Sequence, residues 1–279
     1  MGLVLSIADL ERRETWERLW PGAKVDGPLT APSPLPTEAL DLRDGFAIVP
    51  AAAPDAALLR RRIETLHEAG IPLLFGYLDD AFWTPGLALA QLCTARFRRP
   101  FVLLDDGWAF RVEGGAAGWP AHRGIWEEVL GDDGAPSVLN TWIALSEVPE
   151  SASRMWVVPF SKDPAYPANL ADVSAEAGAV SLPTGPGDAA IWNANLLHWG
   201  GRAETGAPVR VSHTFTIAAE GSSFARTFGV APVLQFPFRA RLDFVARQFA
   251  RYASHDETIP SRVLDWARAT VSLAKLSSR

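Results

Sequence analysis

The stretch VRVSHTFTIAA, residues 209–219, alternates polar or small residues with apolar and β-branched ones. This alternation is typical of a β-strand with two different faces, and it places the side chains of Arg210 and Ser212 on the same face. A guanidinium group beside a hydroxyl group is a good receptor for a carboxylate. The segment therefore predicts a strand with a polar site on it.

Four earlier segments have the same character, since they are short, rich in aromatic and β-branched residues, and separated by Gly, Pro and Asp. They are PFVLLDDGWAFRV (100–112), SVLNTWIALSEV (137–148), RMWVVPFS (154–161) and GDAAIWNAN (187–195). Together with residues 209–219 they predict an antiparallel barrel or a two-sheet sandwich.

Helices are predicted on both sides of this β core. Residues 54–70 begin with Pro and Asp, carry apolar residues at helical spacing and end at a glycine, and residues 85–97 predict a second helix. Two amphipathic helices separated by Pro260 follow the core, and a Pro- and Gly-rich arm over 22–37 precedes it. We therefore expect one domain of 279 residues, helical over 1–98, β over 99–218 and helical again over 235–279.

The composition narrows the classes of partner. A formal charge of -6 and a pI near 5.4 argue against a nucleic acid polymer as partner. The single cysteine, Cys93, leaves no internal disulfide or cysteine-based metal site and fits a reducing compartment. The chain has no apolar run of membrane-spanning length, and its first residues lack the order of a signal peptide. We expect a cytoplasmic protein without a membrane partner.

Two of the five histidines stand apart from the rest. His122 in GWPAHRG and His198 in LLHWGGR each follow a strand-like segment and are flanked by glycine and tryptophan. His67 and His255 are expected at helix ends or turns with structural roles. The sequence around His122 and His198 leaves two interpretations open: a metal site at the mouth of the barrel, or two unrelated loop histidines.

Over about residues 108–217 the chain resembles the phytanoyl-CoA dioxygenase-like branch of the Fe(II)/2-oxoglutarate oxygenases. The resemblance lies in WAFRV, GWPAHRG, LNTWIALSEVPESASRMWVVPFSKDPAY, LPTGPGDAAIWNANLLHWGGR and VRVSHTFTI. It implies a mainly β fold with flanking helices around a double-stranded β-helix, which is the jelly roll of cupin-like proteins. It also implies that His122 and His198 bind Fe(II), and that Arg210, assisted by Ser212, anchors the distal carboxylate of 2-oxoglutarate.

Gly124 departs from the family pattern, which has an aspartate two residues after the first histidine. Two histidines and one carboxylate leave three positions on iron, and a glycine opens a fourth where chloride can bind. Non-haem iron halogenases of this superfamily carry Gly or Ala here, so the resemblance implies a halogenase with a catalytic set of His122, Gly124 and His198. Such an enzyme uses O2, 2-oxoglutarate and chloride to chlorinate an unactivated aliphatic carbon of a free-standing small molecule in natural-product biosynthesis. Amino acids, nucleotides and alkaloid-like compounds all stay open as substrates. A nucleotide or another anionic metabolite would best use the arginines and tryptophans.

Two alternatives remain open at this level. In one, the protein is a hydroxylase in which Glu127 or Glu113 replaces the missing carboxylate, or nothing does. In the other, the chain is a metal-free binding protein on the same fold, or position 124 carries an engineered replacement of aspartate. The presence of both histidines together with Arg210 favours a working metal site over a decayed one.

Six residues are candidates for contact with the substrate. The two tryptophans among them bracket His122, the two asparagines precede His198, and the two arginines suit an anionic ligand. They are Trp119, Arg123, Trp126, Arg154, Asn193 and Asn195.

Overall fold

The computed structural model describes residues 6–131, 133–174, 177–229, 236–252, 254 and 258–277. The chain divides into two compact units. The helical unit consists of Met1–Ala31, Arg61–Thr84 and Pro232–Arg279, and the β unit consists of Pro32–Arg60 and Pro85–Ala231. The expectation of one domain spanning the whole chain stays a prediction.

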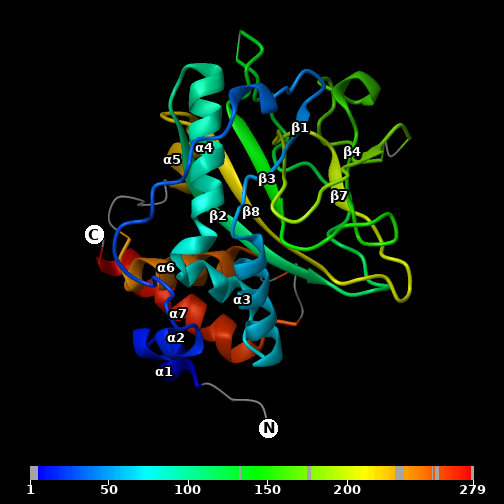
Figure 1. Cartoon of the computed structure of the whole chain (residues 1–279). Coiled ribbons are helices and arrows are strands. Elements are labelled where there is room, and N and C mark those ends of the chain that lie inside the picture. The colour runs from blue at the N-terminus through cyan, green and yellow to red at the C-terminus, as the bar shows by residue number, and fades with distance from the viewer. Residues whose placement is uncertain are drawn as a thin grey trace. The chain divides into compact units, whose positions relative to one another are not determined.

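Two antiparallel sheets build the β unit (Figure 1). The larger sheet has the order β1-β6-β3-β8-β2, formed by Phe46–Val49, Ala189–Asn193, Val138–Ala144, Arg210–Ala219 and Phe101–Val112. The smaller sheet has the order β5-β4-β7, formed by Val180–Ser181, Met155–Val157 and His198–Gly200. The predicted fold class is confirmed. The protein is mainly β, its two antiparallel sheets are those of a jelly-roll core, and helices flank them.

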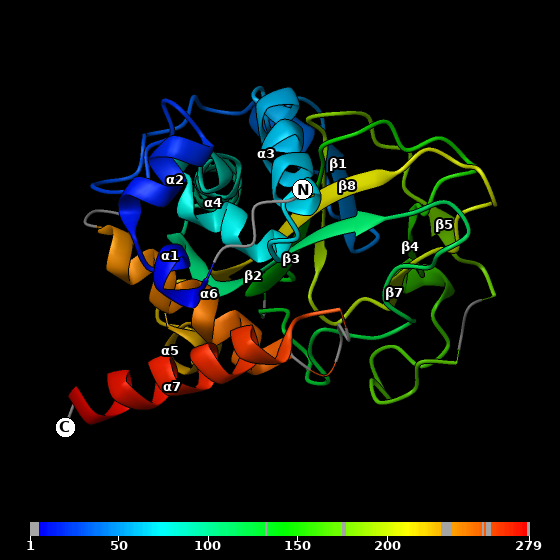
Figure 2. The same cartoon turned by 90° about the horizontal axis from the view of Figure 1, so that it is seen from below.

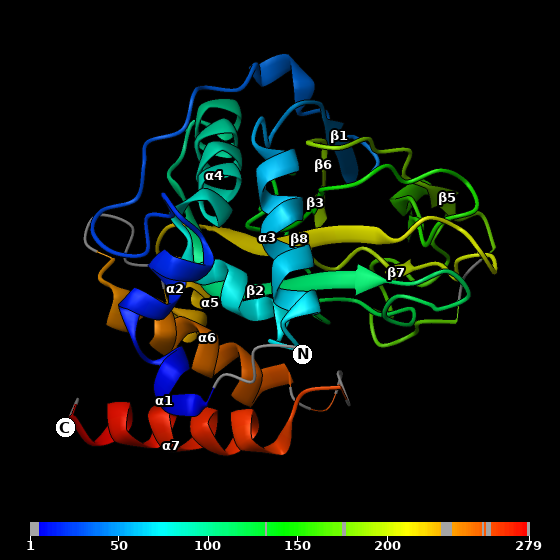
Figure 3. The ribbon, with the colours of Figure 1, turned by 60° about the horizontal axis from the view of Figure 1, so that its bottom comes forward.

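The register of β8 decides which side chains face the interior between the sheets. Arg210 pairs with Val112 of β2, and Thr216 pairs with Asn140 of β3. Residues two apart share a face, so the even-numbered positions of β8 from 210 to 218 all point inward. Figures 2 and 3 show the short strand β7 near one end of β8, and Figure 2 also shows β4 there. Arg210 is the first residue of β8, and its Nη1 donates to the carbonyl of Ser153, close to the start of β4.

Apolar side chains from both sheets fill this interior. A buried cluster joins residues of β3, β4 and β6 and includes Trp142, Val157 and Trp192. The opposite face of the large sheet packs on α4 (Thr84–Phe97). A β-carbon added to Gly86 of this helix would lie 2.7 Å from the ring of Phe215, so only glycine lets the helix come this close to β8.

The helical unit has an aromatic core that includes Trp16, Phe75, Tyr77, Trp83 and Phe244, all fully or nearly fully buried. The remaining helices belong to one of the two units or have residues in both. They are α1 (Ile7–Leu10), α2 (Arg13–Leu19), η1 (Thr37–Ala39), α3 (Ala56–Glu68), η2 (Leu73–Leu78), η3 (Asp80–Phe82), η4 (Phe160–Lys162), α5 (Ser223–Phe228), α6 (Phe238–Tyr252) and α7 (Ser261–Ser277).

Most predicted elements are confirmed. The four predicted helices correspond to α3, α4, α6 and α7, and the five strand-like segments contain β2, β3, β4, β6 and β8. The prediction that residues 1–98 are helical is wrong for Phe46–Val49, because this segment forms β1 and pairs with β6. Within the described residues, no helix combines the length and the apolar character needed to cross a membrane. His255 and part of the predicted range 235–279 lie outside the described residues.

Candidate metal and carboxylate site

The two histidines singled out by the sequence lie side by side in the β unit. His122 sits in the loop after β2 and forms an antiparallel backbone bridge with His198 on β7, in which each amide N–H donates to the other carbonyl at 3.0 Å. Their ring centroids are 4.2 Å apart. Backbone hydrogen bonds therefore bring together two imidazoles from distant segments of the chain.

Both rings have the tautomer that a metal ligand needs. Nδ1 of His122 donates to the Pro120 carbonyl at 2.7 Å, and Nδ1 of His198 donates to the Leu196 carbonyl at 2.9 Å. With the proton held at Nδ1, the lone pair of each ring is on Nε2. Burial, and next the charge of His122, lowers the pKa of His198 well below its ordinary value, so this imidazole stays neutral.

Arg210 is a buried cation on the inward face of β8, with 1% of its surface exposed. Its Nη1 donates to the Ser153 carbonyl at 2.9 Å, and its guanidinium lies over the rings of Phe110 and Trp142 at 5.8 and 5.5 Å. Burial lowers its pKa to about 10. No carboxylate among the described residues forms an ion pair with it.

Several buried donors around Arg210 lack partners within the described part of the chain. They are Nε of Arg210 itself, Oγ of Ser212 and Nε1 of Trp142. Buried polar groups are normally satisfied, so a cluster of orphaned donors around a guanidinium indicates that the site accepts an anion. A carboxylate offers the acceptor oxygens that these groups lack, and the residues therefore fit the distal carboxylate of 2-oxoglutarate.

Gly124 has two polar groups close to its β-carbon side. A β-carbon added here would stand 2.7 Å from Nδ2 of Asn140 and 3.0 Å from the carbonyl oxygen of Ala194. Any side chain at position 124 would therefore require Asn140 to move. Glycine at position 124 is therefore a packing requirement.

Asn140 belongs to a polar chain that the sequence analysis did not find. The Thr216 hydroxyl lies 3.3 Å from Oδ1 of Asn140 and donates to Oδ2 of Asp106 at 2.6 Å. These residues come from β3, β8 and β2 and share the inward face of the sheet. Their inward-facing polar positions within strand-like segments were the available signal, but the sequence does not give the register that brings them together.

Arg123 does not contact the substrate space as predicted. Its side chain is fully buried in an ion pair with Asp163 at 2.7 Å, and it also donates to the carbonyls of Asn195 and Asp172. Every nitrogen of the guanidinium is engaged. The residue fastens the loop after His122 to residues 163–172, so the prediction of substrate contact is corrected to a structural role.

Arg154 also serves the backbone, because its Nε donates to the Val148 carbonyl at 3.0 Å and its Nη1 lies 3.6 Å from Glu150. Asn195 likewise braces the same loop, since its Nδ2 donates to the Glu127 carbonyl at 3.1 Å and to the Glu128 carboxylate at 3.3 Å. Neither arrangement supports the predicted contact with substrate.

The two predicted tryptophans lie in different surroundings. Trp119 packs at the site, with ring centroids 6.0 Å from His122 and 5.3 Å from Phe110. Trp126 is 69% exposed. Trp119 thus stays a candidate for substrate contact, whereas Trp126 presents its ring to solvent.

Neither alternative carboxylate joins the histidine pair. Glu127 is exposed, and Glu113 is 55% exposed and pairs with Arg111. Within the described ranges, no three His, Cys, Asp or Glu side chains form a group that could hold a metal ion.

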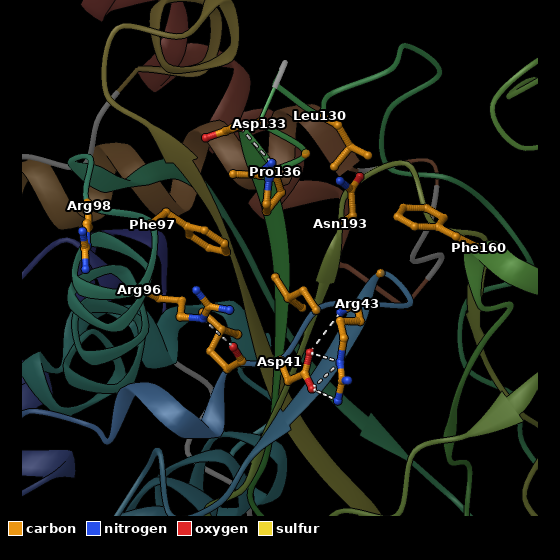
Figure 4. Close-up of a pocket in the computed structure, with 15 residues that line it drawn as sticks. Asp41, Arg43, Arg96, Phe97, Arg98, Leu130, Asp133, Pro136, Phe160 and Asn193 are labelled. Atoms are coloured by element: carbon orange, nitrogen blue, oxygen red, sulfur yellow. Dashed lines mark hydrogen bonds and ion pairs between the residues drawn. The ribbon is translucent and has the colours of Figure 1, made fainter.

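A cavity of about 400 Å³ lies at the end of the large sheet where β1 and β3 begin and β6 ends (Figure 4). Asn193, the last of the predicted contact residues, lines it together with Arg96 and Phe160, and its buried Nδ2 has no partner among the described residues. Asn193 directly precedes Ala194, whose carbonyl approaches Gly124. The lining of the cavity includes none of His122, Gly124, His198 and Arg210.

Comparison with known proteins gives one family match and many structural matches. The model of the family described as phytanoyl-CoA dioxygenase matches residues 88–211. AviO1 from Streptomyces viridochromogenes Tue57 is 24% identical with a TM-score of 0.52, and the match covers 67% of this chain and 94% of AviO1. The epimerase SnoN, in complex with Fe3+, alpha ketoglutarate and nogalamycin RO, is 18% identical with a TM-score of 0.50, covering 68% of this chain and 85% of SnoN. No curated protein matches the sequence. The family model covers less than half of the chain, and the two structures show a shared fold. Neither structure is described as a halogenase.

Proposed function

We propose that the protein is an Fe(II)- and 2-oxoglutarate-dependent halogenase that chlorinates an unactivated aliphatic carbon of a small molecule. The observation that carries the proposal is the pairing of two histidines, each with Nε2 as the metal-binding nitrogen, beside a glycine where relatives have the third ligand. Arg210, a buried cation without an acidic partner, supports 2-oxoglutarate as the co-substrate.

Bound Fe(II), with 2-oxoglutarate and O2, supplies the oxidising chemistry that removes hydrogen from an unactivated carbon. In the overall reaction a C–H bond, chloride and a proton give a C–Cl bond, while O2 places one oxygen atom in succinate and the other in water, with release of CO2. His122 and His198 would hold the metal, and Arg210 with Ser212 would orient the co-substrate. Because Gly124 supplies no negative charge, chloride can bind there and balance the charge on the metal.

A small anionic molecule is the substrate class that we propose. The cavity of about 400 Å³ is within the usual range for small-molecule sites. Its lining includes Arg43, which is paired with Asp41, and also Arg96 and Arg98, for which no carboxylate partner exists among the described residues. Figure 4 shows Arg96 and Phe97 on one side of the space, with Asn193 and Phe160 across from them. The arginines favour a carboxylate or phosphate, and the two aromatic rings favour an apolar ring system.

Action in natural-product biosynthesis belongs to the same proposal. It is supported by the fold shared with SnoN, the epimerase solved with nogalamycin RO.

The test of the iron and 2-oxoglutarate chemistry is succinate formation. The wild-type protein, loaded with Fe(II) and exposed to air, should convert 2-oxoglutarate slowly into succinate even without substrate. His122→Ala and His198→Ala should each abolish this turnover, while Arg60→Ala, at an exposed position outside the site, should leave it unchanged. Equal succinate formation in the histidine variants, or none in the metal-loaded wild type, would refute the proposal.

A further inference from the structure

We propose that Asn140 donates a side-chain hydrogen bond to the anion held beside Gly124, and that it thereby sets the affinity of the site for chloride. This inference rests on the proposed function, because it concerns the ligand that takes the place of the family's carboxylate. It adds a residue from β3 to a site whose other members come from β7, β8 and the loop around His122.

The position of the amide is the first support. Nδ2 of Asn140 lies 2.7 Å from the place of a β-carbon on Gly124, closer than any other atom of the surroundings. A carboxylate at position 124 would begin at that β-carbon, so the amide faces the place that the missing side chain would occupy. Among the described residues Nδ2 has no hydrogen-bond partner. Its N–H groups are therefore available to an acceptor there.

A polar chain lies at the Oδ1 end of Asn140, away from the end that faces Gly124. Oδ1 of Asn140 lies 3.3 Å from the Thr216 hydroxyl, which is itself held by Asp106 at 2.6 Å. The single hydroxyl proton of Thr216 goes to Asp106, so the orientation of the amide follows from the 2.7 Å approach of Nδ2 to the β-carbon position of Gly124. The Thr216 hydroxyl lies next to the amide of Asn140 and donates its hydrogen bond to the Asp106 carboxylate.

The chemistry of an amide N–H explains why an anion is the expected partner. A neutral donor aimed at a negative ligand stabilises it without adding a competing charge. This is the role of an outer-shell residue that hydrogen-bonds a metal-bound carboxylate, here transferred to an external ion. The neighbouring carbonyl oxygen of Ala194 accepts rather than donates, so it cannot take over this role.

The test is the affinity for chloride, measured without turnover. Protein loaded anaerobically with Fe(II) and 2-oxoglutarate in chloride-free buffer is titrated with sodium chloride while the visible charge-transfer band is followed. Loss of a hydrogen bond to an ion weakens binding about tenfold or more, so Asn140→Ala should raise the Kd for chloride by at least about that factor. The affinities for Fe(II) and 2-oxoglutarate should stay within about twofold of the wild type.

Two further variants protect the test against a local folding defect. Thr216→Val leaves the amide in place but removes the neighbouring hydroxyl, and it should raise the Kd for chloride by a smaller factor. Asn169→Ala, at an exposed turn, is the matched control and should behave as the wild type. All variants should retain the circular dichroism spectrum of the parent.

The outcomes separate this proposal from the proposed function. An unchanged Kd for chloride in both Asn140→Ala and Thr216→Val would overturn the role of Asn140 while leaving the halogenase proposal intact. Loss of Fe(II) binding in Asn140→Ala would also overturn it, because the amide would then act as a metal ligand. A wild-type band that does not respond to chloride would overturn both proposals together.

Discussion

Arg210 is a residue whose charge is costly to keep unless a ligand uses it. Its guanidinium is 1% exposed, lies between aromatic rings and has no carboxylate partner among the described residues. Burial lowers its pKa to about 10, which records the same cost of desolvation. A group of this kind contributes to binding an anion and little to the stability of the ligand-free fold.

Arg210→Met should therefore separate binding from stability. We expect the affinity for 2-oxoglutarate to fall at least about 100-fold, because a buried charge pair is lost. The melting temperature of the ligand-free protein should stay the same or rise, because Met replaces an unpaired charge with an apolar side chain of similar length. Calorimetric titration and thermal unfolding measure the two quantities. A large drop in the melting temperature with intact 2-oxoglutarate binding would show that Arg210 has a structural role instead.

At position 124 the structure predicts that a restored aspartate does not fit alone. The added β-carbon would approach Asn140 to 2.7 Å and Ala194 to 3.0 Å, so Gly124→Asp should lower the free energy of unfolding by about 1–3 kcal/mol. Combining it with Asn140→Gly should recover about 1 kcal/mol or more of that loss, because the two positions are in contact. Urea denaturation of the single and double variants gives the coupling energy. Strictly additive effects would contradict the close approach.

The loop that follows His122 depends on a buried ion pair. Arg123 and Asp163 have fully buried side chains and meet at 2.7 Å, which fastens the loop to residues 163–172. Removing one partner leaves the other charge buried without compensation. We expect Arg123→Met to destabilise the protein by about 3–5 kcal/mol, and Arg123→Met with Asp163→Leu to be less destabilised than the single variant. Urea denaturation at neutral pH checks this order. A variant of unchanged stability would restore Arg123 as a candidate for substrate contact.

Strand β8 carries a buried histidine, His213, on the face opposite to Arg210. His213 is fully buried beside Phe215, and burial lowers its pKa to about 3. The unfolded chain takes up a proton at about pH 6.5 whereas the folded chain does not, so this contribution to stability is complete above that pH. It is lost as the pH falls from about 6.5 towards 3.

The pH dependence of unfolding should reveal this group. Between pH 6.5 and 5 the wild type should lose about 2 kcal/mol on account of His213, and His213→Leu should show a correspondingly shallower slope. His67→Leu, on the exposed side of α3, is the control and should keep the wild-type slope. Parallel slopes for the wild type and His213→Leu would contradict the assignment of a neutral buried ring.

Pattern and element length explain which elements the sequence could predict. A periodic spacing of apolar residues can be recognised only in elements of sufficient length. The long strands (β2, β3 and β8) and the long helices (α3, α4, α6 and α7) meet this condition. The strands β1, β5 and β7 have only four, two and three residues, too few to show an alternation. Their pairing is set by contacts with strands distant in the sequence, which no local pattern encodes.

For the molecule as a whole, the candidate site was only partly predictable. The pattern of His122, His198 and Arg210 resembles that of a known family, and the structure brings the two histidines together. The environment of each charged group could not be predicted, because it depends on which backbone carbonyls lie nearby. Arg123 and Arg154 look like substrate ligands in the sequence but satisfy carbonyls and carboxylates of the protein itself. Asn140 was missed for the complementary reason, since its contact with Gly124 depends on the packing of β3 against a loop.

We propose that the histidine pair, Arg210 and the space beside Gly124 together bind Fe(II), 2-oxoglutarate and chloride. Anaerobic titration with Fe(II) and 2-oxoglutarate, with and without chloride, tests it most directly through the visible metal-to-ligand charge-transfer band. We expect a band to form in the wild-type protein and to shift when chloride is added. A band that chloride leaves unchanged would contradict the halogenase proposal, and the absence of any band would contradict the metal site itself.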